Sequence, residues 1–223
     1  IEVAASGGGD ALLVTHSSGY GVGYFGYEAG GDRLVIACDG GGGNNKIDFI
    51  TDAGTSTGGG TDNLNAKVPK MRISAAGHIT KPYNPAFIAG RTGGNQTLTV
   101  GTFPLNVARL NVGNHYSTST YKFTAPVAGV YYFYAQVYYN NGAGQYRMGF
   151  RKTPSGGSAF MLNTSSHQAP NNDSQNSMSI IESLAVGDTV ALYSDQNHSI
   201  QCYYNINNNT FGAHTYFMGY LIG

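Results

Sequence analysis

The side chains that could do chemistry in this chain of 223 residues are six histidines, two cysteines and scattered carboxylates. No two histidines stand two or four residues apart, so they form no local pair of metal ligands. Neither a Cys-x-x-Cys motif nor a mixed cysteine and histidine cluster occurs. The spacing therefore does not predict a zinc site, and we expect Cys38 and Cys202 to be buried free thiols in different domains.

Two other patterns suggest cofactor or catalytic chemistry but lack the sequence context that this chemistry needs. Gly21, Gly23 and Gly26 match Gly-x-Gly-x-x-Gly, but the residues that follow cannot form the helix of a dinucleotide site. Asp32 and Asp39 flank a short apolar run in a glycine-rich region, with no indication of the cleft that a pair of glycosidase carboxylates requires. We therefore expect no enzyme activity, no catalytic residues and no organic cofactor.

Asparagine is concentrated in four expected loops of the C-terminal part, at 140–146, 165–176, 195–199 and 205–210, and the first of them ends on Tyr146. Asparagine tolerates left-handed backbone and caps turns, which explains many of these positions without any function. Asparagine and tyrosine can also hydrogen-bond to sugars and stack on them, so we predict a receptor-binding surface in these loops. Its expected contact residues are Asn140, Asn141, Tyr146, Asn171, Asn172, Asp173, Asn197, His198, Asn207 and Asn208.

The overall composition excludes two classes of partner. Only 11% of the residues are charged, and 12 Lys and Arg balance 12 Asp and Glu. Nucleic-acid binding depends on an excess of basic residues, and the cluster of Lys67, Lys70 and Arg72 is too sparse to supply one. No apolar run approaches the roughly 20 residues of a membrane-spanning helix. We therefore expect neither nucleic-acid binding nor membrane insertion.

The first part of the chain, residues 1–83, is unusually rich in glycine. Of the 33 glycines, 17 fall in the first 60 residues, in bursts that separate short apolar runs. Such runs predict short strands, but glycine costs conformational entropy on ordering, about 0.5–1 kcal/mol relative to alanine. We expect a glycine-rich β shaft in which three copies share one core, with a small β-sandwich as the alternative.

The second part, residues 84–223, begins after Pro82 and Pro85, which disfavour a continuous strand or helix. Its short apolar runs, separated by turn residues, predict an all-β sandwich or jelly roll. The expected strands are 86–89, 97–100, 107–110, 121–124, 129–139, 146–153, 159–163, 178–184, 189–193, 201–204 and 215–221.

One of these strands, at 129–139, carries consecutive aromatic residues. Tyr131 and Phe133 alternate with Tyr132 and Tyr134. Since successive side chains of a strand point to opposite faces, one pair faces the core and the other faces outward. Outward aromatic side chains usually mark a contact surface, although a monomer with exposed tyrosines remains an alternative.

Three segments of this second part resemble the complement C1q globular-head family. The first segment is the spaced set Asn111, Tyr116, Phe123, Gly129, Tyr131 and Phe133. The chain departs from the family's pattern for this segment at Leu105 and Ala135, where the family usually has aromatic residues. The second and third segments are Leu-Ala-Val-Gly-Asp-Thr-Val-Ala-Leu at 184–192 and Tyr-Phe-Met-Gly-Tyr-Leu-Ile at 216–222.

This resemblance implies a C1q- and TNF-like jelly-roll head that forms homotrimers and binds a partner without doing chemistry. The subunit interface that it implies contains Tyr132, Tyr134, Tyr216 and Tyr220. Calcium is a further possibility in the family, and its candidate ligands here are Asp173, Asp188 and Asp195. If three copies share an axis, His78 is the histidine best placed to meet its symmetry mates at a metal ion.

The segment from Met71 to Phe87 is similar to a boundary found in bacteriophage tail fibres, where it joins a β-rich shaft to a C-terminal tip. This similarity implies a virion protein that recognises a host-cell glycan or protein with its tip. Because the chain starts at Ile1 rather than Met, we expect an upstream segment that attaches it to other tail components. A secreted adhesive C1q-like protein and a glycan-hydrolysing tailspike are the alternatives.

Overall fold

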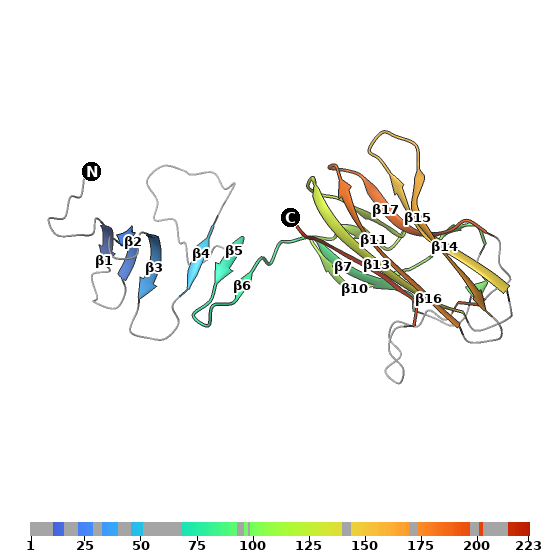
Figure 1. Ribbon diagram of the computed structural model, residues 1–223, viewed down its shortest axis with the longest axis horizontal. Helices are drawn as coiled ribbons and strands as arrows, with labels where there is room; N and C mark the ends of the chain where they lie inside the picture. The colour runs from blue at the N-terminus through green and yellow to red at the C-terminus, as the bar shows by residue number, and fades with distance from the viewer. Residues whose placement is uncertain are drawn as a thin grey trace. The chain divides into compact units, whose positions relative to one another are not determined.

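The computed structural model describes residues 11–15, 22–28, 33–39, 46–50, 68–92, 96–97, 99–139, 144–169, 174–196, 201–202 and 214–223. The chain divides into two compact units, Ile1–Pro82 and Tyr83–Gly223. The described residues form strands and turns without a helix, as the all-β prediction requires (Figure 1). They accordingly include no helix with the length and apolar character to span a membrane.

The first unit contains two small antiparallel sheets in its described part. Among the hydrophobic side chains of these sheets whose burial is described, Ile36, Phe49 and Ile79 are exposed. One sheet contains β1 (Ala11–Thr15), β2 (Val22–Glu28) and β3 (Arg33–Asp39), and the other β4 (Ile47–Phe49), β5 (Met71–Ile73) and β6 (Ile79–Thr80).

Several local contacts stabilise the described part of the first unit. Arg72 makes two hydrogen bonds to the Asp48 carboxylate across β4 and β5, at 2.5 and 2.7 Å. Gly77 closes the β5–β6 turn with a φ of 79°, a left-handed conformation that favours glycine. The Cys38 thiol donates to the Lys46 carbonyl at 3.1 Å and is half-buried, not buried as expected. The Cys202 side chain lies outside the described residues.

The second unit is a sandwich of two antiparallel sheets (Figure 1). The first sheet contains β7 (Ala86–Gly90), β8 (Gln96–Thr97), β10 (Val107–Val112), β13 (Gly129–Tyr139), β16 (Ser174–Leu184), β18 (Gln201–Cys202) and β19 (Tyr216–Leu221). The second sheet contains β9 (Gly101–Thr102), β11 (Tyr116–Ser117), β12 (Lys122–Thr124), β14 (Gly144–Thr153), β15 (Phe160–Ala169) and β17 (Thr189–Ser194).

An aromatic core joins the two sheets. The ring of Phe87 lies 5.0 Å from that of Phe123 and 4.8 Å from that of Phe217, measured between centroids. Full burial of one such ring stabilises the fold by roughly 2–3 kcal/mol. Gly219 is required in β19 because a Cβ atom there would come within 2.5 Å of the Phe133 ring. The core therefore explains both the aromatic residues and the glycine of the sequence pattern.

Polar contacts close one end of this sandwich. The side chain of Asn111 accepts from the Tyr116 amide at 3.0 Å and donates to the Tyr116 carbonyl at 2.9 Å. Nearby hydroxyls donate to backbone carbonyls, Tyr116 to Leu105 at 3.0 Å and Tyr131 to Val127 at 2.8 Å. Burial raises the pKa of both tyrosines, so their phenols stay protonated donors. We call this the closed end.

Two expected loops are shorter in the structure than the sequence predicts. The range 165–176 is an expected loop, but β15 continues to Ala169 and β16 begins at Ser174. The range 140–146 is the other expected loop, but β14 already begins at Gly144. The prediction failed because these segments are polar and show little hydrophobic alternation. They are strands because each residue pairs with a neighbouring strand of its own sheet, Gly144 with Ala169 and Tyr139 with Ser174.

Candidate binding end and subunit face

Strand register places the ends of β13, β14, β15, β16 and β18 at one end of the sandwich, which we call the loop end. The last residue of β13, Tyr139, pairs with Ser174 at the start of β16 and with Cys202 of β18. In the other sheet, the first residue of β14, Gly144, pairs with Ala169 at the end of β15. These strand ends flank the sequence ranges 140–143, 170–173 and 203–213, which themselves lie outside the described residues.

The loop end is opposite to the point where the chain begins the second unit. Near Tyr83, the amide of Leu221 donates to the Pro85 carbonyl at 3.0 Å. The amide of Val130, at the start of β13, donates to the C-terminal residue Gly223 at 2.8 Å. Both contacts belong to the closed end, so the loop end is not occupied by the unit's own termini.

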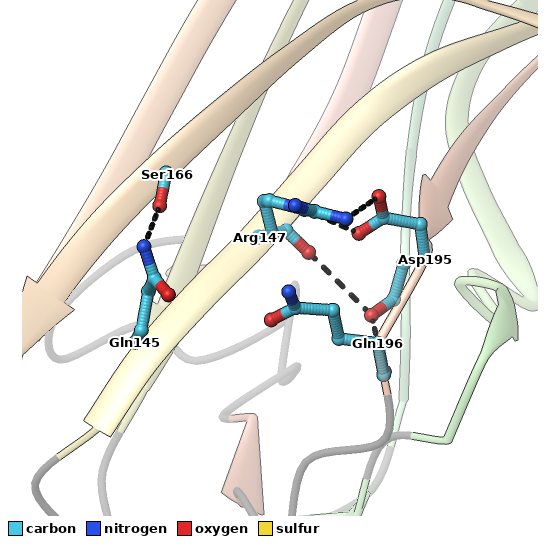
Figure 2. Close-up of polar contacts among 6 residues, drawn as sticks. Gln145, Arg147, Ser166, Asp195 and Gln196 are labelled. Atoms are coloured by element: carbon cyan, nitrogen blue, oxygen red, sulfur yellow. Dashed lines mark hydrogen bonds and ion pairs between the residues drawn. The ribbon is translucent and has the colours of Figure 1, made fainter.

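The described part of the loop end presents polar side chains on β14 and after β17 (Figure 2). The Arg147 guanidinium forms an ion pair with both carboxylate oxygens of Asp195, one of them at 2.9 Å. Figure 2 shows this pair beside Gln196, whose carbonyl accepts from the Ser194 hydroxyl at 3.0 Å. Asp195 raises the pKa of Arg147, mainly through this hydrogen bond, so the cation is secured at all physiological pH values.

Two more contacts cross from β14 and β16 to β15. Gln145 donates from its amide nitrogen to the Ser166 hydroxyl at 2.9 Å, on the exposed face. Ser165 donates to the Asn176 amide oxygen at 2.8 Å, and Asn176 is buried. The exposed residues can still form hydrogen bonds with a ligand, whereas the buried pair fixes the strands that carry the loops.

Most of the predicted contact residues lie outside the described part of the chain. These are Asn140, Asn141, Asn171, Asn172, Asp173, Asn197, His198, Asn207 and Asn208.

The one described contact residue, Tyr146, is not at the surface. Its side chain is 2% exposed and stacks on Tyr139, with 4.4 Å between the ring centroids. The prediction that Tyr146 contacts a ligand is therefore wrong, because β14 already begins at Gly144 and turns the ring inward. The alternation of Tyr146, Met148 and Phe150 is the signal that would have assigned it to the core, and Gln145 and Arg147 to the outside.

The described acidic candidates for calcium are bound to groups of the protein. Asp188 accepts from the backbone amides of Ser155 and Ala185 at 3.0 and 3.1 Å, and lies 3.2 Å from the Lys152 ammonium. Burial raises the pKa of Asp188, but these partners outweigh it and the net pKa is lowered. Asp195 is paired with Arg147. The described residues contain no group of three metal-ligating side chains, so calcium stays a prediction that depends on Asp173 and the loops.

Two further candidates concern the first unit. His78 lies in the exposed β5–β6 hairpin, where its amide donates to the Ser74 hydroxyl at 3.1 Å, and a metal shared between copies stays a prediction. The sequence also contains a Gly-x-Ser-x-Gly pattern at 54–58, outside the described residues. A serine nucleophile of that type needs a strand before it and a helix after it, and the pattern alone carries no catalytic assignment.

The outer face of the first sheet carries the four tyrosines expected at a subunit interface. The Tyr132 and Tyr220 rings lie 5.4 Å apart, and the Tyr134 and Tyr216 rings 5.7 Å apart. Burial is the main cause that raises the pKa of Tyr216 to about 12, and the neighbouring Tyr134 hydroxyl raises it further. The face is also apolar at its edge, where Ile181 is 62% exposed. We call these five residues the aromatic face.

Comparisons with known proteins agree with this architecture. Residues 86–222 match the family model of the C1q domain. The globular domain of zebrafish complement 1qA is 19% identical with a TM-score of 0.46, covering 62% of this chain and 98% of that chain. Eiger TNF from S. frugiperda is 12% identical with a TM-score of 0.52, covering 63% and 93%. Murine APRIL at pH 5.0 is 11% identical with a TM-score of 0.50, covering 62% and 99%. No curated protein matches the chain.

Proposed function

The chain belongs to the C1q domain family through residues 86–222, and from this premise we propose that it is a trimeric binding or adhesive protein. C1q domains are typically extracellular binding modules without enzyme activity, and homotrimers are typical of the family. The observation that carries the proposal is that the strand ends next to the Asn-rich sequence ranges lie together at one end of the sandwich, away from the unit's termini.

The proposed trimer uses the aromatic face. Tyr132, Tyr134 and Tyr216 are half-buried within one chain, and Tyr220 is 43% exposed. A second and third copy would cover this surface and release the water that it now orders. The tyrosine hydroxyls can find hydrogen-bond partners at such an interface, which is why tyrosine is common there.

The trimer and the ligand contacts are linked through avidity. Each loop end offers amide and hydroxyl groups suited to sugars or polar protein surfaces, and such single contacts are weak. Displaying three loop ends together raises the effective concentration and strengthens binding to a repetitive surface, by roughly 10² to 10⁴. The proposed ligand is therefore a repeated structure, with a cell-surface polysaccharide as the first candidate.

A bacteriophage tail fibre is a second candidate for the role of the whole protein. The resemblance of residues 71–87 to a tail-fibre boundary and the 17 glycines of the first 60 residues favour it. In that case the ligand is a host bacterial surface and the protein is part of a virion. Neither the family match nor the similar structures indicates a tail fibre, so the broader proposal of a trimeric binding protein has the stronger support.

Two measurements test the proposal. Light scattering should give a mass about three times the 23.5 kDa of one chain. Tyr132→Glu with Tyr220→Glu should give a folded monomer, whereas the matched Thr124→Glu, on the exposed face of the other sheet, should leave the trimer intact. A folded, monomeric wild-type protein would overturn the trimer.

The second measurement is binding of labelled trimer to a panel of bacterial strains and to a glycan array, with polysaccharide length monitored. Selective binding by the trimer, weakened at least a hundredfold in the monomeric variant, supports the proposal. Selectivity for bacterial strains favours the tail fibre. Shortened polysaccharide would show that the protein hydrolyses glycans and would replace the proposed binding function. Absence of selective binding on both panels would overturn the proposed binding function.

A further inference from the structure

A small pocket opens on the outer face of the second sheet, and none of its lining residues belongs to the loop-end contacts or to the aromatic face. Its volume is about 200 Å³. It is lined by Thr102, Lys122, Arg151, Thr153, Ala159 and Ala191.

The sheet register explains why a hollow forms here. Arg151 of β14 lies directly opposite Ala191 of β17, and Phe123 of β12 lies opposite Val190 of β17. Lys122 and Arg151 therefore stand on either side of β17, about 10 Å apart across two strand spacings. Because the residue between these long side chains is an alanine, the surface is recessed and both cations line the same space.

The charge of this pocket differs from that of the neighbouring surface. Arg147 is neutralised by Asp195, and Lys152 is 3.1 Å from the Glu182 carboxylate. Within the described part of the chain, neither Lys122 nor Arg151 forms an ion pair with a carboxylate, and the pocket lining contains no acidic residue. Two positive charges thus share one recess without an internal counterion there.

The arginine is also held in a fixed orientation. Its guanidinium carbon lies 4.4 Å from the centre of the Tyr193 ring, a cation–π arrangement. A ring contact uses the flat face of the guanidinium and leaves the N–H donors at its edge available, in the fork that matches the two oxygens of a carboxylate or sulfate. Thr102 and Thr153 add hydroxyls, which can both donate and accept hydrogen bonds.

We propose that this pocket binds the anionic group of an acidic sugar, a carboxylate or a sulfate ester. Arg151 would bind two of its oxygens, Lys122 would complete the charge balance, and the threonines would contact the sugar hydroxyls. This inference rests on the proposed binding function but assigns it a second surface, with a ligand class that the loop end does not specify.

The same geometry argues against other anionic ligands. The volume lies below the roughly 300–1,000 Å³ of typical small-molecule sites, so the pocket takes one sugar unit and not a large cofactor. A peptide cannot add as a strand, because β17 already pairs with β12 and β14 on its two sides. Two cations in a chain with balanced charge do not form a phosphate-backbone track.

The test compares the wild-type trimer with Arg151→Gln, Lys122→Gln and Lys81→Gln. Lys81 is exposed and lies in the first unit, so its variant removes the same charge away from the pocket. The immobilised probes are a glucuronic-acid oligosaccharide, a sulfated oligosaccharide and their neutral glucose counterpart, with poly-glutamate and inorganic sulfate as competitors.

The proposal predicts binding to at least one acidic oligosaccharide and not to the neutral one. Arg151→Gln and Lys122→Gln should each weaken this binding about tenfold, and Lys81→Gln less than twofold. The stronger of the two acidic probes identifies carboxylate or sulfate as the preferred group. Circular dichroism and light scattering check that each variant is a folded trimer.

Three results would overturn the proposal. Equal binding to the neutral sugar or unchanged binding by both pocket variants would exclude this site while leaving glycan binding at the loop end intact. Competition by poly-glutamate or inorganic sulfate at the same concentration of anionic groups would show general anion binding instead of sugar recognition. A protein that binds no probe on these surfaces, nor any strain or glycan in the wider panels, would fail both this inference and the proposed function.

Discussion

The two ends of the C1q domain each contain an ion pair made by strand β14, and the two pairs differ in surroundings. At the loop end, the Arg147 side chain is 40% exposed and has Asp195 as its carboxylate partner. At the closed end, Lys152 is 12% exposed, its ammonium reaches Glu182 and Asp188, and it donates to the Ser183 carbonyl at 2.9 Å. The surface pair is screened by water, whereas each member of the buried network depends on the others.

This difference indicates that the two ends of strand β14 have different roles, structural at the closed end and ligand-binding at the loop end. The closed end fixes the turns and the termini of the domain through bonds that would be costly to break. The loop end keeps its charges and amides near water, where they can exchange solvent for a ligand at little cost. The following predictions test that division, from the largest expected effect to the smallest.

The largest effect is expected at Asp188. Asp188→Asn removes the carboxylate that accepts from Ser155 and Ala185 and pairs with Lys152, so Lys152 stays buried with less compensation. We expect the free energy of unfolding to fall by about 3 kcal/mol. Urea unfolding followed by circular dichroism measures it. A loss below about 1 kcal/mol would show that the closed end is no more dependent on its charges than an exposed surface.

The second effect concerns the turn after β10. Asn111→Ala removes both hydrogen bonds to the Tyr116 backbone and leaves these groups without that partner. The expected loss is about 2 kcal/mol. Asn84→Ala is the matched control, because the Asn84 side chain makes one long bond, 3.4 Å, to the Leu221 carbonyl. Equal losses for the two variants would contradict the special role of Asn111.

Acid should weaken the closed end through Asp188. The pKa of Asp188 is lowered in the folded protein, so its contribution is complete above the ordinary pKa of about 4 and is lost as the pH falls from there through the folded value. We expect the stability difference between wild type and Asp188→Asn to be constant from pH 5 to 7 and to shrink below about pH 4. Urea titrations at each pH measure it. A difference that grows in acid would reverse the assigned sign.

The smallest effect on stability is expected at the loop end. Asp195→Asn breaks the pair with Arg147, but both side chains are partly solvated, so the loss of stability should be smaller than for Asp188→Asn or Asn111→Ala. Binding on the glycan or strain panel should nevertheless change, because the variant frees the guanidinium beside Gln196. Unchanged binding together with a large loss of stability would mean that this pair is structural, and the two ends would no longer differ.

Much of the sandwich could be predicted from local patterns. The strand 129–139 was predicted with the bounds that the structure gives, because eleven residues alternate between the core and the outside. The inward side of this alternation gives the buried residues Tyr131 and Phe133. The C1q resemblance was carried by the same residues and is confirmed by the family match over 86–222.

Other elements could not be predicted because their stability comes from a partner strand. The polar ends of β15 and β16 have little hydrophobic alternation, and β11 contains only Tyr116 and Ser117. Backbone pairing with a neighbour, such as Tyr116 with Phe123, makes these segments strands. Tyr146 was assigned to a loop for the same reason: the start of β14 depends on pairing across to β15.

The sequence alone therefore determined the all-β class and the faces on which Tyr131 and Tyr132 lie, because strand alternation is a property of consecutive residues. Only the tertiary structure decided which distant residues meet. It brought Asp195 to Arg147, placed Lys122 and Arg151 on either side of Ala191, and gathered the ends of β13, β14, β15 and β16 at one end. Strand order and register determine these contacts between distant residues. Both depend on the packing of the whole sandwich rather than on any local sequence pattern.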